Sequence, residues 1–306
     1  MQAWPDGVIF WERGWLSSNN TLLIDPDQAI LIDSGYWTHS DQTLALLQSA
    51  LGTRPLTGLV NTHLHSDHCG GNAALQQAYP ACFTQVPPGH ADFVSQWDPV
   101  ALSYTPTGQH CPRFGIQGVI TPGTSFEVAG RTWQAHAAPG HDPHSIVLFC
   151  PSEGLLISAD ALWENGFGVV FPEIEGDAAF DEVAATLDVI ERLQPRLVLP
   201  GHGSAFSDVG QALARARKRL AGFVANPDKH ASYAAKVLLK FKLLELQTIG
   251  FTDFCAWGQQ ADYLRLLHAR HAAAPQPFDA WFKQLCESLV FSNAASWEGD
   301  KLCNAG

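Results

Sequence analysis

The densest group of potential metal ligands in this sequence lies between a short apolar run and a pair of glycines. Within six positions the chain places three histidines and one aspartate: His63, His65, Asp67 and His68. Alternate side chains of an extended segment point to the same side, so the imidazoles of His63 and His65 can reach one point. Asp67 and His68 follow as the chain turns, and they offer ligands from another direction. Neutral imidazole and carboxylate are ligands of zinc, iron and manganese, which predicts a metal site.

One metal ion cannot easily use four side chains from so short a segment, because tetrahedral and octahedral coordination require widely separated directions. Two ions could share them if further ligands came from elsewhere. Three candidates follow strand-like apolar runs, as the first group does: His141, Asp160 and His202. We therefore expect a site for two metal ions. Two alternatives stay open: histidines that serve only on the surface or in the core, and a structural metal, although structural zinc sites are usually rich in cysteine.

The elements expected around the first ligand group indicate an α/β arrangement. Residues 7–33 contain apolar runs joined by an Asp-Pro-Asp turn and should form strands, whereas residues 40–52 have helical spacing. A strand over residues 56–62 and a helix over residues 71–80 flank the histidines. The ligands thus lie where a strand gives way to a helix, a place where α/β proteins put ligand sites.

Strands and helices continue to alternate until the character of the sequence changes near residue 210. Further strands are expected over 124–130, 131–140, 145–150, 154–160 and 195–203, with an amphipathic helix over 178–193. The stretch from about Phe83 to Gly118 is rich in Pro, Gly and aromatic residues without periodicity, which indicates an irregular lid or binding loop. Helices are then expected over 210–226, 232–247, 260–274 and 277–291. We divide the chain into a domain of residues 1–209 and a helical segment of residues 210–306.

Five short motifs resemble, in the same order, those of the metallo-β-lactamase-fold hydrolases, in particular the dinuclear branch with glyoxalase II and related thioesterases, lactonases and phosphodiesterases. The motifs are LIDSG at Leu31–Gly35, THLHSDHCGG at Thr62–Gly71, PGH at Pro139–His141, SAD at Ser158–Asp160 and PGHG at Pro200–Gly203. The resemblance covers about residues 7–207. It implies an α+β fold, a four-layer αβ/βα sandwich of two facing sheets with helices outside. An all-helical C-terminal segment follows, which resembles the helical caps of some metallo-hydrolases.

The resemblance also implies a role for each candidate ligand. Three residues would bind the first metal ion: His63, His65 and His141. Three others would bind the second: Asp67, His68 and His202. Asp160 would bridge both ions, and Asp33 would support the metal loop without binding metal. Asp67 and Asp160 are the predicted catalytic residues of this set.

The chemistry expected of such a site is hydrolysis. Two divalent cations about 3.5–4 Å apart lower the pKa of a shared water molecule, so hydroxide becomes available as a nucleophile. Zinc is the expected metal, with iron or manganese as alternatives. Aromatic residues lie just beyond Asp160 and in the aperiodic stretch: Trp163, Phe167, Phe171, Trp97 and Tyr104. Such a lining suits a small-molecule thioester, ester or lactone with an apolar acyl or aromatic part.

Other activities of the fold stay open at this point. A phosphodiesterase, a diiron redox protein and a metabolite sensor could use the same scaffold. Glutathione specificity is not expected, because no Lys or Arg lies between Arg131 and Arg192, where glyoxalase II has basic residues. His144 is a further candidate for a substrate contact. The C-terminal helices could form a wall of the substrate pocket, or they could serve only for stability or for a homodimer.

The composition argues against polyanionic partners. The formal net charge of −12 would repel the phosphates of nucleic acids and of anionic membranes. The opening residues do not read as a signal peptide, and no apolar run approaches the roughly 18 residues of a membrane span, so a cytoplasmic protein is expected. Seven cysteines without a C-x-x-C spacing suit reduced thiols. Cys69, beside the ligands, is expected to take no part in metal binding.

Overall fold

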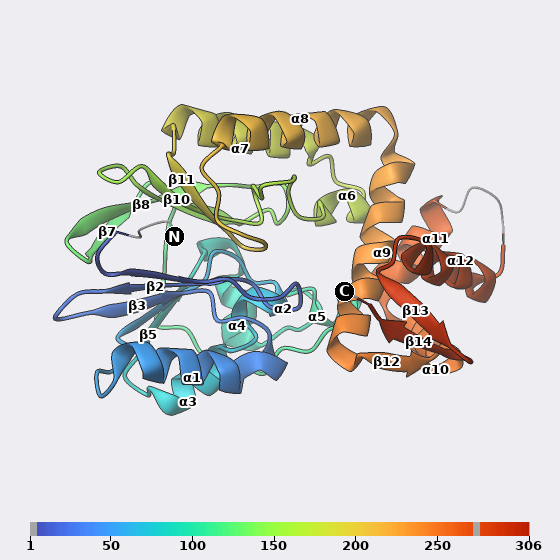
Figure 1. The fold of residues 1–306 in the computed structure, drawn as a ribbon, viewed down its shortest axis with the longest axis horizontal. Coiled ribbons are helices and arrows are strands. Elements are labelled where there is room, and N and C mark those ends of the chain that lie inside the picture. The colour runs from blue at the N-terminus through green and yellow to red at the C-terminus, as the bar shows by residue number, and fades with distance from the viewer. Residues whose placement is uncertain (1–4, 272–275, 306) are drawn as a thin grey trace.

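Two facing β-sheets form the centre of the molecule in the computed structural model, which describes residues 5–271 and 276–305 (Figure 1). The first sheet has the order β1-β2-β3-β4-β5-β6. Its strands are β1 (Val8–Trp11), β2 (Asn20–Ile24), β3 (Ala29–Ile32), β4 (Gly58–Val60), β5 (Phe83–Val86) and β6 (Gly118–Val119). The pairs from β1 to β3 are antiparallel, and those from β3 to β6 are parallel.

The second sheet has the order β11-β10-β9-β8-β7 and is antiparallel except for the parallel pair of β10 and β11. Its strands are β7 (Ser125–Val128), β8 (Arg131–Ala137), β9 (Ile146–Cys150), β10 (Leu155–Ala159) and β11 (Leu197–Pro200). Side chains that alternate along a strand pack into two different hydrophobic layers, one on each face of the sheet. In β10, Leu155 and Ile157 pack between the sheets, whereas Leu156 packs on the outer side.

Helices cover the outer face of each sheet and complete four layers (Figure 1). On the first sheet lie α1 (Ser40–Leu51) and α3 (Asn72–Ala78), which bury Leu47 and Leu75 against the strands. On the second lies α7 (Phe180–Leu193), with Val183, Leu187 and Ile190 turned inward at helical spacing. The predicted αβ/βα sandwich is confirmed.

The stretch from Phe83 to Gly118 is more regular than the sequence indicated. It contains strands β5 and β6, a 3₁₀ turn η2 (Pro88–His90) and two short helices, α4 (Ala91–Gln96) and α5 (Tyr104–Thr107). The expectation of an irregular loop was wrong because each element is too short to show a hydrophobic period. The parallel pairing of Gln85 with Gly118 is a tertiary contact that no local pattern reveals.

The C-terminal part is mainly helical, as expected, but it also contains a small sheet. Its helices are α8 (Val209–Ala225), α9 (Pro227–Leu246), α10 (Phe251–Gln260), α11 (Asp262–His271) and α12 (Phe278–Phe291). The end of the helix predicted over 260–274 falls on residues 272–274, outside the described residues. The sheet has the order β12-β14-β13, from β12 (Thr248–Gly250), β13 (Ala295–Glu298) and β14 (Lys301–Asn304). Gly299 and Asp300 form the two-residue turn between β13 and β14, in the stretch after residue 291 for which no element was predicted.

Two hydrophobic clusters organise this part of the molecule. Helix α8 packs with α7 in the outer layer of the sandwich, whereas α9 to α12 share a second core that includes Leu239, Phe254 and Phe282. Helix α9 runs across one end of the sandwich between these bodies (Figure 1). The division of the chain at residue 209/210 stays a prediction. Within the described ranges, no helix combines the length and hydropathy that a membrane span requires.

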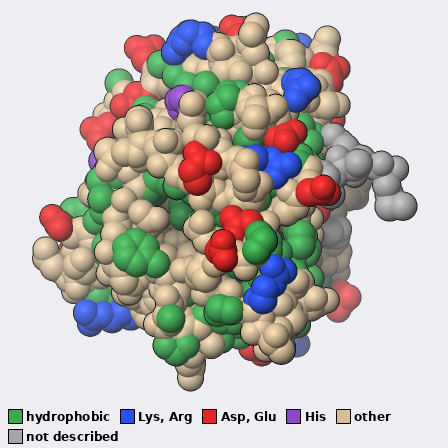
Figure 2. Space-filling model, turned by 90° about the vertical axis from the view of Figure 1, so that its left-hand side faces the viewer, with side chains coloured by type: hydrophobic (Ala, Val, Ile, Leu, Met, Phe, Trp, Pro, Cys, Tyr) green, Lys and Arg blue, Asp and Glu red, His purple; other side chains and the backbone are tan. Residues whose placement is uncertain are grey.

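The end of the sandwich away from α9 has a mixed surface. Figure 2 shows acidic, basic and apolar side chains interspersed over that face, with no single class gathered into a continuous patch. The residues that could do chemistry lie toward the end of the sheets that α9 covers.

Candidate metal centre

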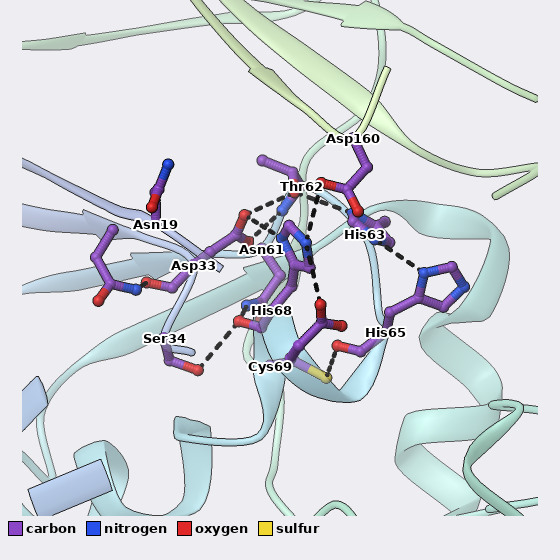
Figure 3. Close-up of polar contacts among 12 residues, drawn as sticks. Asn19, Asp33, Ser34, Asn61, Thr62, His63, His65, His68, Cys69 and Asp160 are labelled. Carbon is purple, nitrogen blue, oxygen red and sulfur yellow. Dashed lines mark hydrogen bonds and ion pairs between the residues drawn. The ribbon is translucent and has the colours of Figure 1, made fainter. Parts of the chain in front are cut away.

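The seven candidate ligands all lie on connections that leave the ends of strands, and the structure brings their ligand atoms into two groups. His63 and His65 lie in the loop after β4, and the short helix α2 (Ser66–Cys69) carries Asp67 and His68 (Figure 3). The second sheet supplies the rest: His141 after β8, Asp160 after β10 and His202 after β11. The centre therefore forms only where both sheets meet.

The first group consists of three converging imidazole nitrogens. His63 Nε2 lies 3.1 Å from His65 Nδ1, and His65 Nδ1 lies 2.8 Å from His141 Nε2. Two nitrogens that each lie about 2.0–2.1 Å from one ion at a tetrahedral angle are about 3.3 Å apart. The observed spacing therefore fits a shared metal ion.

The second group mixes two histidines with two carboxylates. Asp67 Oδ2 lies 3.0 Å from His202 Nε2, and Asp160 Oδ1 lies 3.5 Å from His68 Nε2. Asp160 also reaches the first group, because its Oδ2 lies 3.4 Å from His141 Nε2. His68 Nε2 is buried and has no hydrogen-bond partner among the described residues. A metal ion bound to this nitrogen would supply the missing partner.

Two supporting contacts fix the ring orientations. Asp33 Oδ2 accepts hydrogen bonds from His68 Nδ1 and from Thr62 Oγ1, each at 2.8 Å, and its Oδ1 accepts one from the Thr62 backbone N–H at 2.9 Å. Val169 O accepts a hydrogen bond of 2.5 Å from His141 Nδ1. Both rings thus turn Nε2 toward the ligand groups, the usual arrangement around a metal. Asp33 lies behind His68 and is not itself in either group (Figure 3).

Burial and charge prepare the donor atoms. Burial, with the nearby His68 and His65, lowers the pKa of His63 well below its ordinary value, and burial with His141 lowers the pKa of His65 to about 4. These rings are therefore neutral at pH 7, with lone pairs available to a metal. Burial alone would raise the pKa of Asp160, but the charges of His202 and His68 outweigh it and hold that pKa well below its usual range. Asp160 is therefore an ionised carboxylate.

A partly enclosed pocket opens onto both groups. Its remaining lining is largely apolar: Trp15, Trp163, Phe171 and, from α9, Tyr233, Val237, Leu238 and Phe241. Trp163 Nε1 donates a hydrogen bond of 3.1 Å to Asp160 Oδ1, and the Trp15 ring stacks on His202 with centroids 5.5 Å apart. Helix α9 thus lines one side of the pocket.

The structure separates the aromatic residues singled out in the sequence. Trp163 and Phe171 line the pocket, whereas Phe167 packs in the core against Phe223 of α8. Trp97 and Tyr104 lie in a hydrophobic cluster beneath the metal loop. The prediction that these last three line the pocket was therefore wrong, because sequence position near a ligand does not fix the direction of a side chain.

Two further residues singled out in the sequence lie outside the ligand groups. His144 packs edge-on against His90, with ring centroids 4.6 Å apart, and neither ring lines the pocket above the ligands. Cys69 Sγ lies 3.3 Å from His65 O and 3.1 Å from Tyr104 Oη, and it belongs to neither ligand group. That Cys69 takes no part in metal binding stays a prediction.

Sequence reasoning missed Trp15 as a site residue. It lies in the loop between β1 and β2, and no spacing signal connects it with the ligands. The apolar face of α9 was visible as helical periodicity that includes Tyr233, Val237 and Phe241, but periodicity alone does not say what a helix packs against.

Comparisons with known proteins show the family to which this chain is similar. The family model described as "Metallo-beta-lactamase superfamily" matches residues 13–202. A hydroxyacylglutathione hydrolase of Anaeromyxobacter dehalogenans is 32% identical over 222 residues, which cover 70% of this chain and 75% of that protein. A second one, from Dechloromonas aromatica, is 30% identical over 172 residues, 56% of this chain and 52% of that protein.

The thioesterase pkgB of Emericella nidulans is 27% identical over 154 residues, which cover 50% of this chain and only 36% of that protein. Several curated relatives are thus matched over about half of their length or less.

The crystal structure of a metallo-beta-lactamase family protein of Thermus thermophilus shares the fold at 19% identity and a TM-score of 0.57. That similarity covers 97% of this chain and 98% of the other, the C-terminal part included. The family model and the 32%-identical relative show that the chain belongs to the metallo-beta-lactamase superfamily.

Proposed function

We propose that this protein is a dinuclear metal-dependent hydrolase of a small-molecule thioester, ester or lactone with an apolar acyl or aromatic part. The observation that carries the proposal is the position of the two ligand groups, which share Asp160 and open onto a pocket with an aromatic and aliphatic lining. The hydroxyacylglutathione hydrolase and thioesterase relatives support a thioester as the first choice.

Each ligand has a role in this proposal. His63, His65 and His141 would hold the first ion, and Asp67, His68 and His202 would hold the second, with Asp160 in reach of both ligand groups. Two divalent cations held there would supply a hydroxide nucleophile and positive charge for the oxyanion of the acyl group. The carboxylates of Asp67 and Asp160 would balance the positive charge of the ions. The indole N–H of Trp163 donates a hydrogen bond to the Asp160 carboxylate and so fixes its orientation. Zinc is the proposed metal.

The aromatic walls serve binding. Trp15, Trp163 and Phe171 offer apolar faces beside the carboxylates and imidazoles, so an acyl chain or aromatic ring can displace water from them while the reacting carbonyl lies over the ligands. Glutathione is not proposed as the leaving group, because the segment after Asp160 has no basic residue before Arg192.

Metal analysis and a substrate panel test the proposal together. We expect about two transition-metal ions per chain, and higher turnover on thioesters or esters of apolar acids than on phosphodiesters. His63→Ala should remove most of the metal and most of the turnover. Full thioester hydrolysis by protein shown to be metal-free would contradict the mechanism, and a clear preference for phosphodiesters would replace the substrate class.

A further inference from the structure

A second cavity, partly open to solvent, lies beside the metal pocket along α9. The two spaces share a boundary of five residues: Trp15, Trp163, Tyr233, Val237 and Phe241. Beyond that boundary the second cavity is lined by Lys236, Lys240 and Leu244 of α9 together with Leu289 and Ser292. The same five side chains therefore border both spaces, which makes the second cavity the direct neighbour of the metal pocket.

Most of this cavity is apolar, and part of it is open to water. Trp15 is 56% exposed, an unusual amount for a tryptophan, although its ring also stacks on that of His202. Lys240 follows Tyr233 by seven residues, which corresponds to about 10 Å along a helix that rises 1.5 Å per residue. The space beside α9 therefore has the length of a medium acyl chain.

Two lysines on this wall form no ion pair with any carboxylate of residues 5–271 and 276–305. Lys236 and Lys240 are four residues apart and share one face of α9. The ammonium of Lys240 donates to three neutral oxygens: Ala294 O at 2.6 Å, Asn304 Oδ1 at 2.6 Å and Ala305 O at 3.0 Å. Lys236 is half-buried and makes no hydrogen bond or ion pair with any residue that the structure describes.

The setting makes these charges notable. The chain has 30 acidic and 18 basic residues, so an acidic partner for a lysine is easily found, and the neighbouring Lys242 pairs with Glu245 at 2.6 Å. An ammonium beside apolar surface gains most from an anion that arrives with its own apolar part, because the charged hydrogen bond then forms where water is partly excluded. Among the described residues, none occupies the donors of Lys236, so they are available for such a bond.

We infer that the second cavity binds the apolar part of the substrate and that Lys236, with the field of Lys240 beside it, binds an anionic group that the substrate carries. The inference rests on the proposed function, because it places the scissile bond over the ligand groups and the anion in the second cavity. The anion is a carboxylate on the acyl part or a phosphate on the leaving group. Lys236 is then a residue that determines specificity without belonging to either ligand group.

Three octanoyl-length thioesters separate the two sources of the anion. The first is octanoyl N-acetylcysteamine, which is neutral, the second its analogue with a terminal carboxylate on the acyl chain, and the third octanoyl coenzyme A, which carries phosphate on the leaving group. Lys236→Gln removes the charge at nearly equal length, and Lys236→Arg keeps it. Lys218→Gln, at an exposed position of α8, is the matched control.

Lys236→Gln should raise KM about tenfold for whichever anionic thioester uses the cavity and leave KM for the neutral one within about twofold. Lys236→Arg should restore most of the difference, and Lys218→Gln should change nothing. A rise of KM for the carboxylated substrate alone assigns the anion to the acyl part, and a rise for the coenzyme A thioester alone assigns it to the leaving group. Equal effects on all three substrates, or no effect on either anionic one, would overturn the inference.

A binding measurement keeps this result separate from the proposed function. Octanesulfonate titrated calorimetrically at fixed ionic strength should bind the wild-type protein about tenfold more tightly than Lys236→Gln. If the wild type hydrolyses no thioester but shows this difference, the proposed reaction fails and the anion site stands. If thioesters are hydrolysed and octanesulfonate binds both proteins equally, the anion site fails and the reaction stands.

Discussion

Asp33 illustrates how one carboxylate outside the ligand groups can determine the geometry inside them. It follows β3 with a φ of 58°, in the left-handed region that non-glycine residues seldom adopt. Its three hydrogen bonds to Thr62 and His68 hold it there. The backbone strain is thus balanced by contacts that orient a single imidazole.

We expect Asp33→Ala to weaken metal binding by about 10- to 100-fold, because the His68 ring loses the acceptor that directs its Nε2 toward the second ligand group. Competition with a chelator measures this affinity. Asp41→Ala, at an exposed position of α1, is the control and should leave it unchanged. Equal metal affinity in both variants, with both folded, would show that Asp33 does not position the ligand.

Asp160 has the opposite character, since it touches both ligand groups directly. Asp160→Asn keeps the shape of the side chain but removes the negative charge that would screen the repulsion between two cations. We expect lower metal occupancy and a loss of turnover of at least about 100-fold, measured by metal analysis and by steady-state kinetics on one thioester. Asp181→Asn at an exposed position of α7 serves as the control. Normal kinetics and normal metal content in Asp160→Asn would remove it from the bridging position.

At the scale of elements, the centre depends on how closely the strand ends approach one another. A Cβ on Gly201, directly after β11, would lie 2.2 Å from Asp160 Oδ1 and 2.9 Å from the backbone carbon of Ala159. Asn19 clamps the same turn, because its side-chain amide donates to Pro200 O at 2.9 Å and to Gly203 O at 2.8 Å. The turn that carries His202 thus has no room for a side chain at position 201.

Gly201→Ala should therefore displace Asp160 and reduce metal content and turnover together. Gly210→Ala is the matched control, since a Cβ there meets nothing within 4 Å and the residue lies in the first turn of α8. Alanine at that position should leave activity unchanged and stability equal or slightly higher. If both variants keep full metal content, the close approach at Gly201 is not required for the site.

The elements that the sequence predicted well are those whose signals are local. The seven candidate ligands follow strand-like runs, and parallel or neighbouring strands carry such ends to one edge of a sandwich, so their convergence could be predicted. The strands β5 and β6, the hairpin of β13 and β14, and the place of Trp15 could not. Each depends on pairing or packing between segments far apart in the chain, and periodicity records nothing of that.

At the scale of the whole molecule, α9 joins the two cores and closes the pocket. Tyr233 packs against both hydrophobic clusters, and Phe241 meets Tyr36 of the sandwich with ring centroids 5.1 Å apart. Helix α9 is therefore packed against both cores and against the sandwich. The pocket is thus lined in part by side chains more than 30 residues beyond the last candidate ligand, His202.

We expect Val237→Phe to narrow both cavities, because Val237 lines each of them. The ratio of kcat/KM for octanoyl over acetyl thioesters should fall at least fivefold, while acetyl turnover stays near the wild-type value. Val224→Phe is the control, since Val224 is 57% exposed on α8. An unchanged ranking of acyl lengths in Val237→Phe would mean that α9 only stabilises the fold.

Because each ligand group draws side chains from loops of both sheets, a bound ion acts as a cross-link between the halves of the sandwich. An unfolded chain cannot hold these loops together, so the ion binds the native state alone and its free concentration enters the unfolding equilibrium. Each ion present at 100 times its dissociation constant adds about 2.7 kcal/mol to the free energy of unfolding. The melting temperature of this protein should therefore rise with the logarithm of free metal, and a chelator should act on it as a denaturant.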